Sequence, residues 1–153
     1  MTLTVASAAF GVGQPMPPRY TATAENWSPP LTWSRPPEGT KTIAVLCEDP
    51  DAPRGLWVHW VLYNLPPTTR ALPEHVPTAA LLPDQARQGV NGSGTTGYSG
   101  PYPPPGTPHR YFFKVVALDT VLELPAKTTR AQLLEAVAGH ILAEGETYGT
   151  FQR

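Results

Sequence analysis

The chain of 153 residues is long enough to bury a substantial hydrophobic core, and we expect a single domain over residues 1–153. Its net charge is −1 and only 15% of its residues are charged, which excludes a basic surface for nucleic acid or an anionic membrane. The single cysteine excludes an intrachain disulfide, and no apolar run approaches the roughly 18 residues of a membrane span, so we expect a soluble protein of the cytoplasm.

Proline accounts for 20 of the 153 residues, well above the ~5% of an average protein. Apolar, strand-like segments lie between the prolines, so the prolines do not mark a disordered tract. Because proline is excluded from helix interiors and from central strands, its spread along the chain favours a β-rich domain with long ordered loops.

The apolar segments predict a series of strands. Short strands within loops are expected over residues 2–33, and longer strands are expected at 41–49, 56–65 and 109–119. The sequence LWVHWVLYNL of residues 56–65 is apolar on both faces, which is typical of a strand inside a covered sheet. Simple alternation along this strand places His59 on the same face as Trp57 and Val61.

One helix is predicted, over residues 128–145. Thr129 and Gln132 match a capping box at its start, and Gly145 is a plausible end. Apolar residues recur within it at helical spacing, at Leu133, Leu134, Val137 and Ile141. The residues that follow, 146–153, predict a short strand or an extended tail. The fold class is therefore mainly β, an antiparallel β-sandwich with Pro/Gly-rich loops and one C-terminal helix.

The stretch DPDAP, residues 49–53, joins two of the long strands and carries two carboxylates. Pro50 and Pro53 each fix their own φ at about −65° and push the preceding residue into an extended conformation, so the loop is stiff. Asp49 ends one strand and His59 lies in the next, so the loop could bring them together. Alternatively, His59 is a structural residue of the core, and Asp49 and Asp51 only bond the turn backbone.

A second candidate cluster lies in GYSGPYPPPGTPHRYFF, residues 97–113. Its rigid part consists of three consecutive prolines, Pro103, Pro104 and Pro105. Gly100 and Gly106 permit tight turns or the close approach of a ligand to the backbone. His109 and Tyr111 then follow on one strand face. Two histidines reached from stiff loops, with aromatic residues beside them, indicate a pocket in which His and Tyr donors hold a small anion such as phosphate.

Other kinds of site fit the sequence less well. GSGTTG at residues 92–97 has the spacing of a dinucleotide fingerprint, but a proline-rich stretch follows it where a helix should begin. No serine lies in an activating context, so a hydrolase is a weak alternative. The acidic and histidine residues lack the spacing of a metal site. We therefore expect no enzyme activity, no metal and no cofactor.

These motifs make the chain recognisable: it resembles the phosphatidylethanolamine-binding protein family, in its prokaryotic Raf-kinase-inhibitor-like branch. The resemblance spans nearly the whole length and rests on SPPLTW (28–33), DPDAP (49–53), WVHW (57–60) and the stretch 97–113. It implies a β-sandwich whose pocket binds phosphate, sulfate or the phosphorylated headgroup of a phospholipid. The pocket residues that it implies are Asp49, Asp51, Pro53, Trp57, His59, Gly100, Pro103, His109 and Tyr111.

The resemblance also implies partners and shows two departures. Members of the family modulate protein kinases or proteases, so the alternative function is that of an inhibitor or scaffold acting through surface loops. Prokaryotic members are often dimeric, which predicts a homodimer. Animal members carry a second histidine where this chain has Val58, and they are richer in small residues where it has Pro101 and Tyr102, so we expect Tyr102 to narrow or reshape the mouth of the pocket. In addition, their C-terminal helix, which closes the pocket, is largely absent here, since the chain stops soon after Tyr148.

Overall fold

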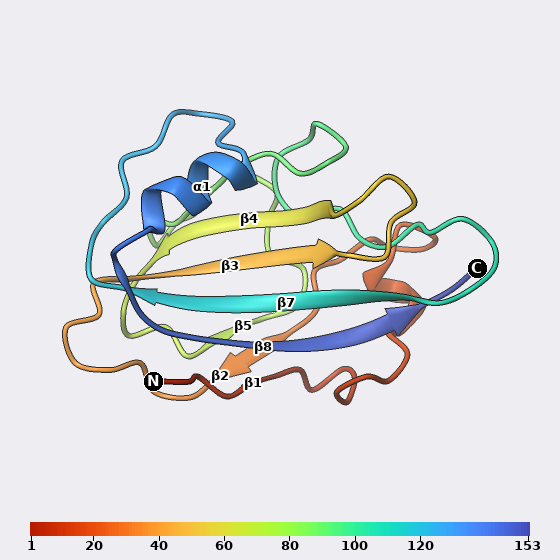
Figure 1. Ribbon diagram of the computed structural model, residues 1–153, viewed down its shortest axis with the longest axis horizontal. Helices are drawn as coiled ribbons and strands as arrows, with labels where there is room; N and C mark the ends of the chain where they lie inside the picture. Colours follow the sequence, from red (N-terminus) through yellow and green to blue (C-terminus); the bar gives the residue numbers. More distant parts are fainter.

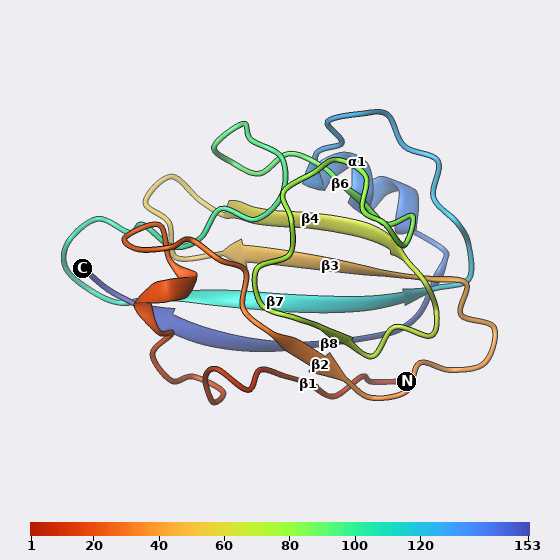
Figure 2. The same ribbon diagram turned by 180° about the vertical axis from the view of Figure 1, so that it is seen from behind.

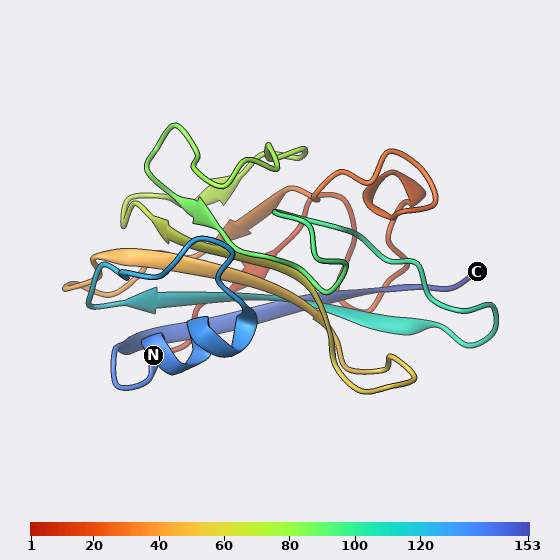
Figure 3. The same cartoon turned by 90° about the horizontal axis from the view of Figure 1, so that it is seen from above.

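The computed structural model describes residues 1–153 as two antiparallel sheets packed face to face, with a helix on the outer face of the larger sheet (Figure 1, Figure 3). The smaller sheet has the order β1-β2-β5, with bounds Val5–Ala6 (β1), Leu31–Trp33 (β2) and Ala71–Leu72 (β5). The larger sheet has the order β6-β4-β3-β7-β8, with bounds Thr42–Asp49 (β3), Trp57–Leu65 (β4), Arg87–Gln88 (β6), His109–Leu118 (β7) and Ile141–Phe151 (β8). The predicted antiparallel β-sandwich is confirmed.

The main core lies between the two sheets, and a smaller cluster lies on the outer face of the larger sheet under the α-helix. Every residue of β3 is buried, because this strand is in the middle of the larger sheet and is covered on both faces. On β4, Trp60 and Leu62 belong to the main core, whereas Val61 and Tyr63 belong to the outer cluster. The prediction of an interior strand with two apolar faces is therefore confirmed.

The helices are short. A 3-10 turn, η1, covers Pro18–Tyr20, and the α-helix α1 covers Arg130–Val137. The capping box at the start of α1 is present as predicted: the hydroxyl of Thr129 accepts from the Gln132 N–H, and the Gln132 side chain accepts from the Thr129 N–H. Neither helix is long and apolar enough to cross a membrane.

The predicted end of the helix is wrong. The helix stops at Val137, and Gly139, with φ +82°, turns the chain into β8. Ile141 therefore starts an 11-residue strand instead of continuing the helix, and Gly145 pairs with Val115 of β7 inside that strand. Long-range pairing with β7 along nearly the whole of β8 outweighs the local helical spacing of the apolar residues.

A β-bulge in β4 changes the face on which His59 lies. Consecutive residues of β3 pair across it, Cys47 with Trp60 and Glu48 with Val58, so His59 is the extra residue. A bulge of this kind reverses the alternation of side chains. His59 lies beside Tyr111, which belongs to the main core, with ring centroids 5.2 Å apart. The sequence-based placement of His59 on the face of Val61 is therefore wrong.

Candidate functional site

A cavity of about 430 Å³ opens at one end of the larger sheet. Strand β3 ends there with Asp49, and β4 and β7 start there with Trp57 and His109. The three strand ends meet because β3 runs antiparallel to both of its neighbours, as Figure 2 shows. The sheet thus brings together residues that are far apart in the sequence.

Eight of the nine predicted site residues line this cavity: Asp49, Pro53, Trp57, His59, Gly100, Pro103, His109 and Tyr111. The ninth, Asp51, does not. The lining also includes Tyr102 and Pro104 of the predicted 97–113 cluster, and four residues that the sequence did not indicate: Ala22, Ala52, Ser93 and Ser99. Most of these are small or flank a predicted residue, and no chemical signal in the sequence distinguishes them.

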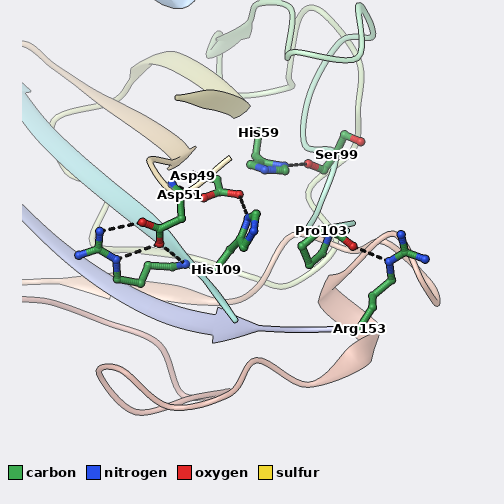
Figure 4. A network of polar contacts seen from close by, with 8 residues as sticks. Asp49, Asp51, His59, Ser99, Pro103, His109 and Arg153 are labelled. Carbon is green, nitrogen blue, oxygen red and sulfur yellow. Dashed lines mark hydrogen bonds and ion pairs between the residues drawn. The ribbon is translucent and has the colours of Figure 1, made fainter. Parts of the chain in front are cut away.

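Asp49 and His109 form a buried pair. The Nδ1 atom of His109 lies 2.7 Å from Oδ2 of Asp49, and their side chains are only 10% and 5% exposed (Figure 4). The other carboxylate oxygen of Asp49 accepts the backbone N–H of Asp51 at 2.8 Å. Because a carboxylate accepts, Nδ1 of His109 carries the proton, and Nε2 remains for a ligand. Asp49 thus orients an imidazole across the β3–β7 pair, and His59 of β4 has another partner.

His59 is held by a backbone carbonyl. Its Nδ1 donates to the oxygen of Ser99 at 2.6 Å, so its Nε2 also remains free of protein partners. Burial lowers the pKa of His59 below its usual value, and the Ser99 carbonyl and the Asp49 charge offset this only in part. His59 is therefore neutral at pH 7, with a lone pair on Nε2.

The ring of Tyr111 lies close to both imidazoles. Its ring meets that of His59 edge to face, and it is nearly parallel to that of His109 at 6.5 Å. Burial, and next the charge of Asp49, raise the pKa of the Tyr111 phenol well above its usual range. The phenol therefore keeps its proton and adds no charge to the cavity.

The wall at Gly100 depends on close packing. A Cβ at this position would lie 2.5 Å from the carbonyl oxygen of Tyr20, so no other residue fits without a shift. The N–H of Gly100 donates to the side chain of Asn26 at 2.6 Å. Asn26 has φ +61°, a conformation that asparagine adopts more readily than most residues. Nothing local in the sequence indicates that Asn26 supports a segment more than 70 residues away.

Asp51 is bonded to Arg110 and does not line the cavity. Its carboxylate accepts from the backbone N–H, Nε and Nη2 of Arg110, each at 2.9 Å (Figure 4). These hydrogen bonds to Arg110 hold the pKa of Asp51 below its usual value. Asp51 therefore fastens the stiff 49–53 loop to the start of β7, outside the cavity.

The charges of the cavity are few. No lysine or arginine is among the lining residues, and Asp49 is the only carboxylate. No group of three or more His, Cys, Asp or Glu side chains is arranged to hold a metal ion. A ligand in this cavity therefore meets two imidazoles, each fixed through Nδ1, a protonated phenol and a wall of proline and glycine.

Comparisons with known proteins agree with this architecture. The family model described as Phosphatidylethanolamine-binding protein matches residues 6–152. A UPF0098 protein of Methanothermobacter thermautotrophicus is 49% identical over 145 residues, which are 95% of each chain. Two crystal structures are similar over nearly their whole lengths. The Chlamydia trachomatis homologue CT736 has 39% identity and a TM-score of 0.90 (99% and 98% covered), and E. coli YbcL has 33% and 0.92 (100% and 99%).

Proposed function

The chain belongs to the phosphatidylethanolamine-binding protein family, and we propose that its cavity binds a small phosphorylated anion, free or as the headgroup of a larger molecule. The observation that carries this proposal is the pair of histidines, His59 and His109. Each has its Nδ1 bonded to the protein, which leaves both Nε2 atoms for one shared cavity. Fixed imidazoles of this kind select a ligand by the position of its oxygen atoms.

The protonation states of the two histidines favour two kinds of anion: one that carries its own proton, or one whose binding causes an imidazole to take up a proton. Neutral His59 presents a lone pair at Nε2, which accepts from the P–O–H group of a phosphate monoanion. An imidazolium at either histidine would instead donate a charge-assisted hydrogen bond to a fully ionised oxygen. Asp49 balances a positive charge on His109, so the pair can hold a proton beside the anion without leaving an unpaired buried charge.

Titration with inorganic phosphate and with phosphoethanolamine, followed by NMR and calorimetry, tests the proposal. His109→Gln and Asp49→Asn should each weaken phosphate binding at least tenfold, since the first removes one of the two imidazoles and the second removes the charge from the buried hydrogen bond that orients it. The chain contains a matched control in His140 and Asp119, an exposed His–Asp pair at 2.8 Å that does not line the cavity. His140→Gln should leave the affinity unchanged. Equal losses in the cavity and control variants would contradict the assignment.

We also propose that residues 1–153 act as one domain that binds rather than catalyses, in the cytoplasm and as a homodimer. Light scattering at micromolar concentration tests the dimer.

The alternative function is that of an inhibitor of a kinase or protease that acts through its loops. Exposed apolar side chains near the mouth of the cavity favour this alternative, because such side chains are typical of a surface that binds another protein. They are Leu56, Trp57 and Tyr102, which are 42%, 44% and 58% exposed; Trp57 and Tyr102 line the cavity, and Leu56 precedes Trp57. Inhibition assays with the native protein and with Leu56→Ser would distinguish the two functions, because Leu56 is exposed and does not line the cavity.

A further inference from the structure

The proline-rich wall of the cavity makes almost no hydrogen bonds of its own. Between Pro101 and His109, only Tyr102, Gly106 and Thr107 have a backbone N–H, because the other positions are prolines. At one end, the carbonyl of Pro101 accepts from Ala22 at 2.9 Å, and at the other His109 enters β7. The segment 102–108 between these anchors cannot form a sheet or a helical turn with itself.

Arg153, beyond the end of β8, supplies all of the hydrogen bonds that this segment makes. Its Nε donates to the carbonyl of Pro103 at 2.5 Å, and its own carbonyl accepts from the N–H of Gly106 at 3.3 Å. Its guanidinium also lies over the ring of Tyr102, with 3.9 Å from Cζ to the ring centroid. One residue thus contacts the wall at three positions, Tyr102, Pro103 and Gly106.

The direction of these contacts places Arg153 behind the wall. Figure 4 shows His59 and His109 on one side of Pro103 and the guanidinium of Arg153 on the other. Tyr102, Pro103 and Pro104 line the cavity, and Pro103 is buried although most of its neighbours are exposed. Arg153 therefore does not contact a ligand in the cavity, and it affects ligand binding only by holding the wall in place.

We propose that Arg153 is a positioning residue that latches segment 102–106 against the cavity and so sets the size of the anion that the cavity admits. The size selection rests on the proposed function, whereas the latch itself does not. The planar guanidinium is suited to this role, because it stacks on an aromatic ring while donating in its own plane. Without the latch, the wall swings between its two anchors, and the cavity both loosens and widens.

Arg153→Met tests the latch in the ligand-free protein. We expect the ¹⁵N heteronuclear NOE of the Tyr102, Gly106 and Thr107 amides to fall in this variant, since it reports backbone motion on the ps–ns timescale. Arg35 is an exposed arginine with no side-chain hydrogen bond or ion pair, so Arg35→Met is the matched control and should leave these amides unchanged. Unchanged amides in Arg153→Met would overturn the proposal, whether or not phosphate binds.

Titration with phosphate and with the bulkier phenyl phosphate tests the size selection. Arg153→Met should weaken phosphate by about two- to fivefold, the range expected from an exposed cation–π contact alone, and should weaken phenyl phosphate less. Arg153→Lys keeps the charge but loses the planar donor, so it should behave like Arg153→Met. If Arg153→Lys retains native dynamics and native selectivity, the residue acts only as a charge and the latch is refuted. If the native protein does not bind phosphate, the proposed function is refuted. The latch is then judged from the heteronuclear NOE of the amides alone.

Discussion

Binding of a fully ionised anion should cause the protein to take up a proton at His59. The groups that face this imidazole are the Ser99 carbonyl, Tyr111, Asp49 and His109, of which only Asp49 carries a fixed charge. Because His59 is neutral at pH 7 and its Nε2 holds a lone pair, it cannot donate to sulfate until it is protonated. Sulfate brings no proton of its own, so solvent must supply one.

The magnitude follows from the linkage between binding and protonation. Above the lowered pKa of His59, uptake of one proton makes the sulfate affinity rise about tenfold for each unit by which the pH falls, or about 1.4 kcal/mol. The slope flattens once the pH falls below the pKa of His59 in the free protein. A phosphate monoester takes up the same proton above pH ~6, on either its own oxygen or the imidazole, so sulfate is the cleaner probe.

Calorimetry in two buffers of different ionisation enthalpy measures this proton directly. At pH 7.5, His59→Gln should reduce the uptake per bound sulfate by about one proton relative to the native protein, because glutamine donates without titrating. His140→Gln, at an exposed histidine that does not line the cavity, should leave the uptake unchanged. If native uptake is zero, or if His59→Gln retains all of it, His59 does not contact the anion and the site is built differently.

Three further predictions concern the supports of the site. Gly100→Ala should lower the free energy of unfolding by about 1–3 kcal/mol, because its Cβ would lie 2.5 Å from the Tyr20 oxygen; denaturant melts check this against Gly11→Ala, which meets only a flexible side chain. Asp51→Asn should cost less than about 1 kcal/mol in the same assay and should change phosphate affinity little, since its ion pair with Arg110 is partly exposed and lies outside the cavity. Glu48→Gln should destabilise the protein by about 1–3 kcal/mol and flatten its acid-unfolding curve, because it removes charged hydrogen bonds to two partly exposed cations. Lys114 and Arg130 outweigh the effect of burial and hold the pKa of Glu48 below its usual value. Stability from Glu48 is present above the ordinary pKa of the group and is lost as the pH falls through the lowered one, so pH-dependent melts reveal it.

The sequence predicts those parts of the fold and of the candidate site that depend on local chemistry. The long strands are continuous apolar runs with strand-forming residues, and the stiff acidic loop follows from its prolines. The end of the helix could not be predicted, because the spacing up to Ile141 is helical and only pairing with β7 makes this segment a strand. The face on which His59 lies could not be predicted either, since the bulge in β4 depends on the register with β3 and not on the residue pattern of β4 itself.

The partners within the site depend on long-range contacts in the same way. The sequence leaves open which imidazole Asp49 orients, and the carboxylate bonds His109, 60 residues away, although His59 is nearer along the chain. Asn26 and Arg153 support the walls from the two ends of the chain and belong to no motif. Resemblance to a family identifies the residues that line a pocket, whereas the residues that hold those in place emerge only from coordinates.

Glu48 and Asp49 show how one strand end serves both stability and binding. They are consecutive on β3, so they point to opposite faces of the sheet. Glu48 is almost fully buried and meets two permanent cations, Lys114 and Arg130, so its charge is neutralised at any pH near neutrality. Asp49 is as deeply buried, but its only basic partner is the imidazole of His109, and its other oxygen accepts the backbone N–H of Asp51. A permanent cation at that place would keep a constant charge beside the ligand, whereas an imidazole lets the charge of the cavity follow the protonation of the anion. The outer face of the strand thus supports the fold, while the inner face can adjust its charge to what it binds.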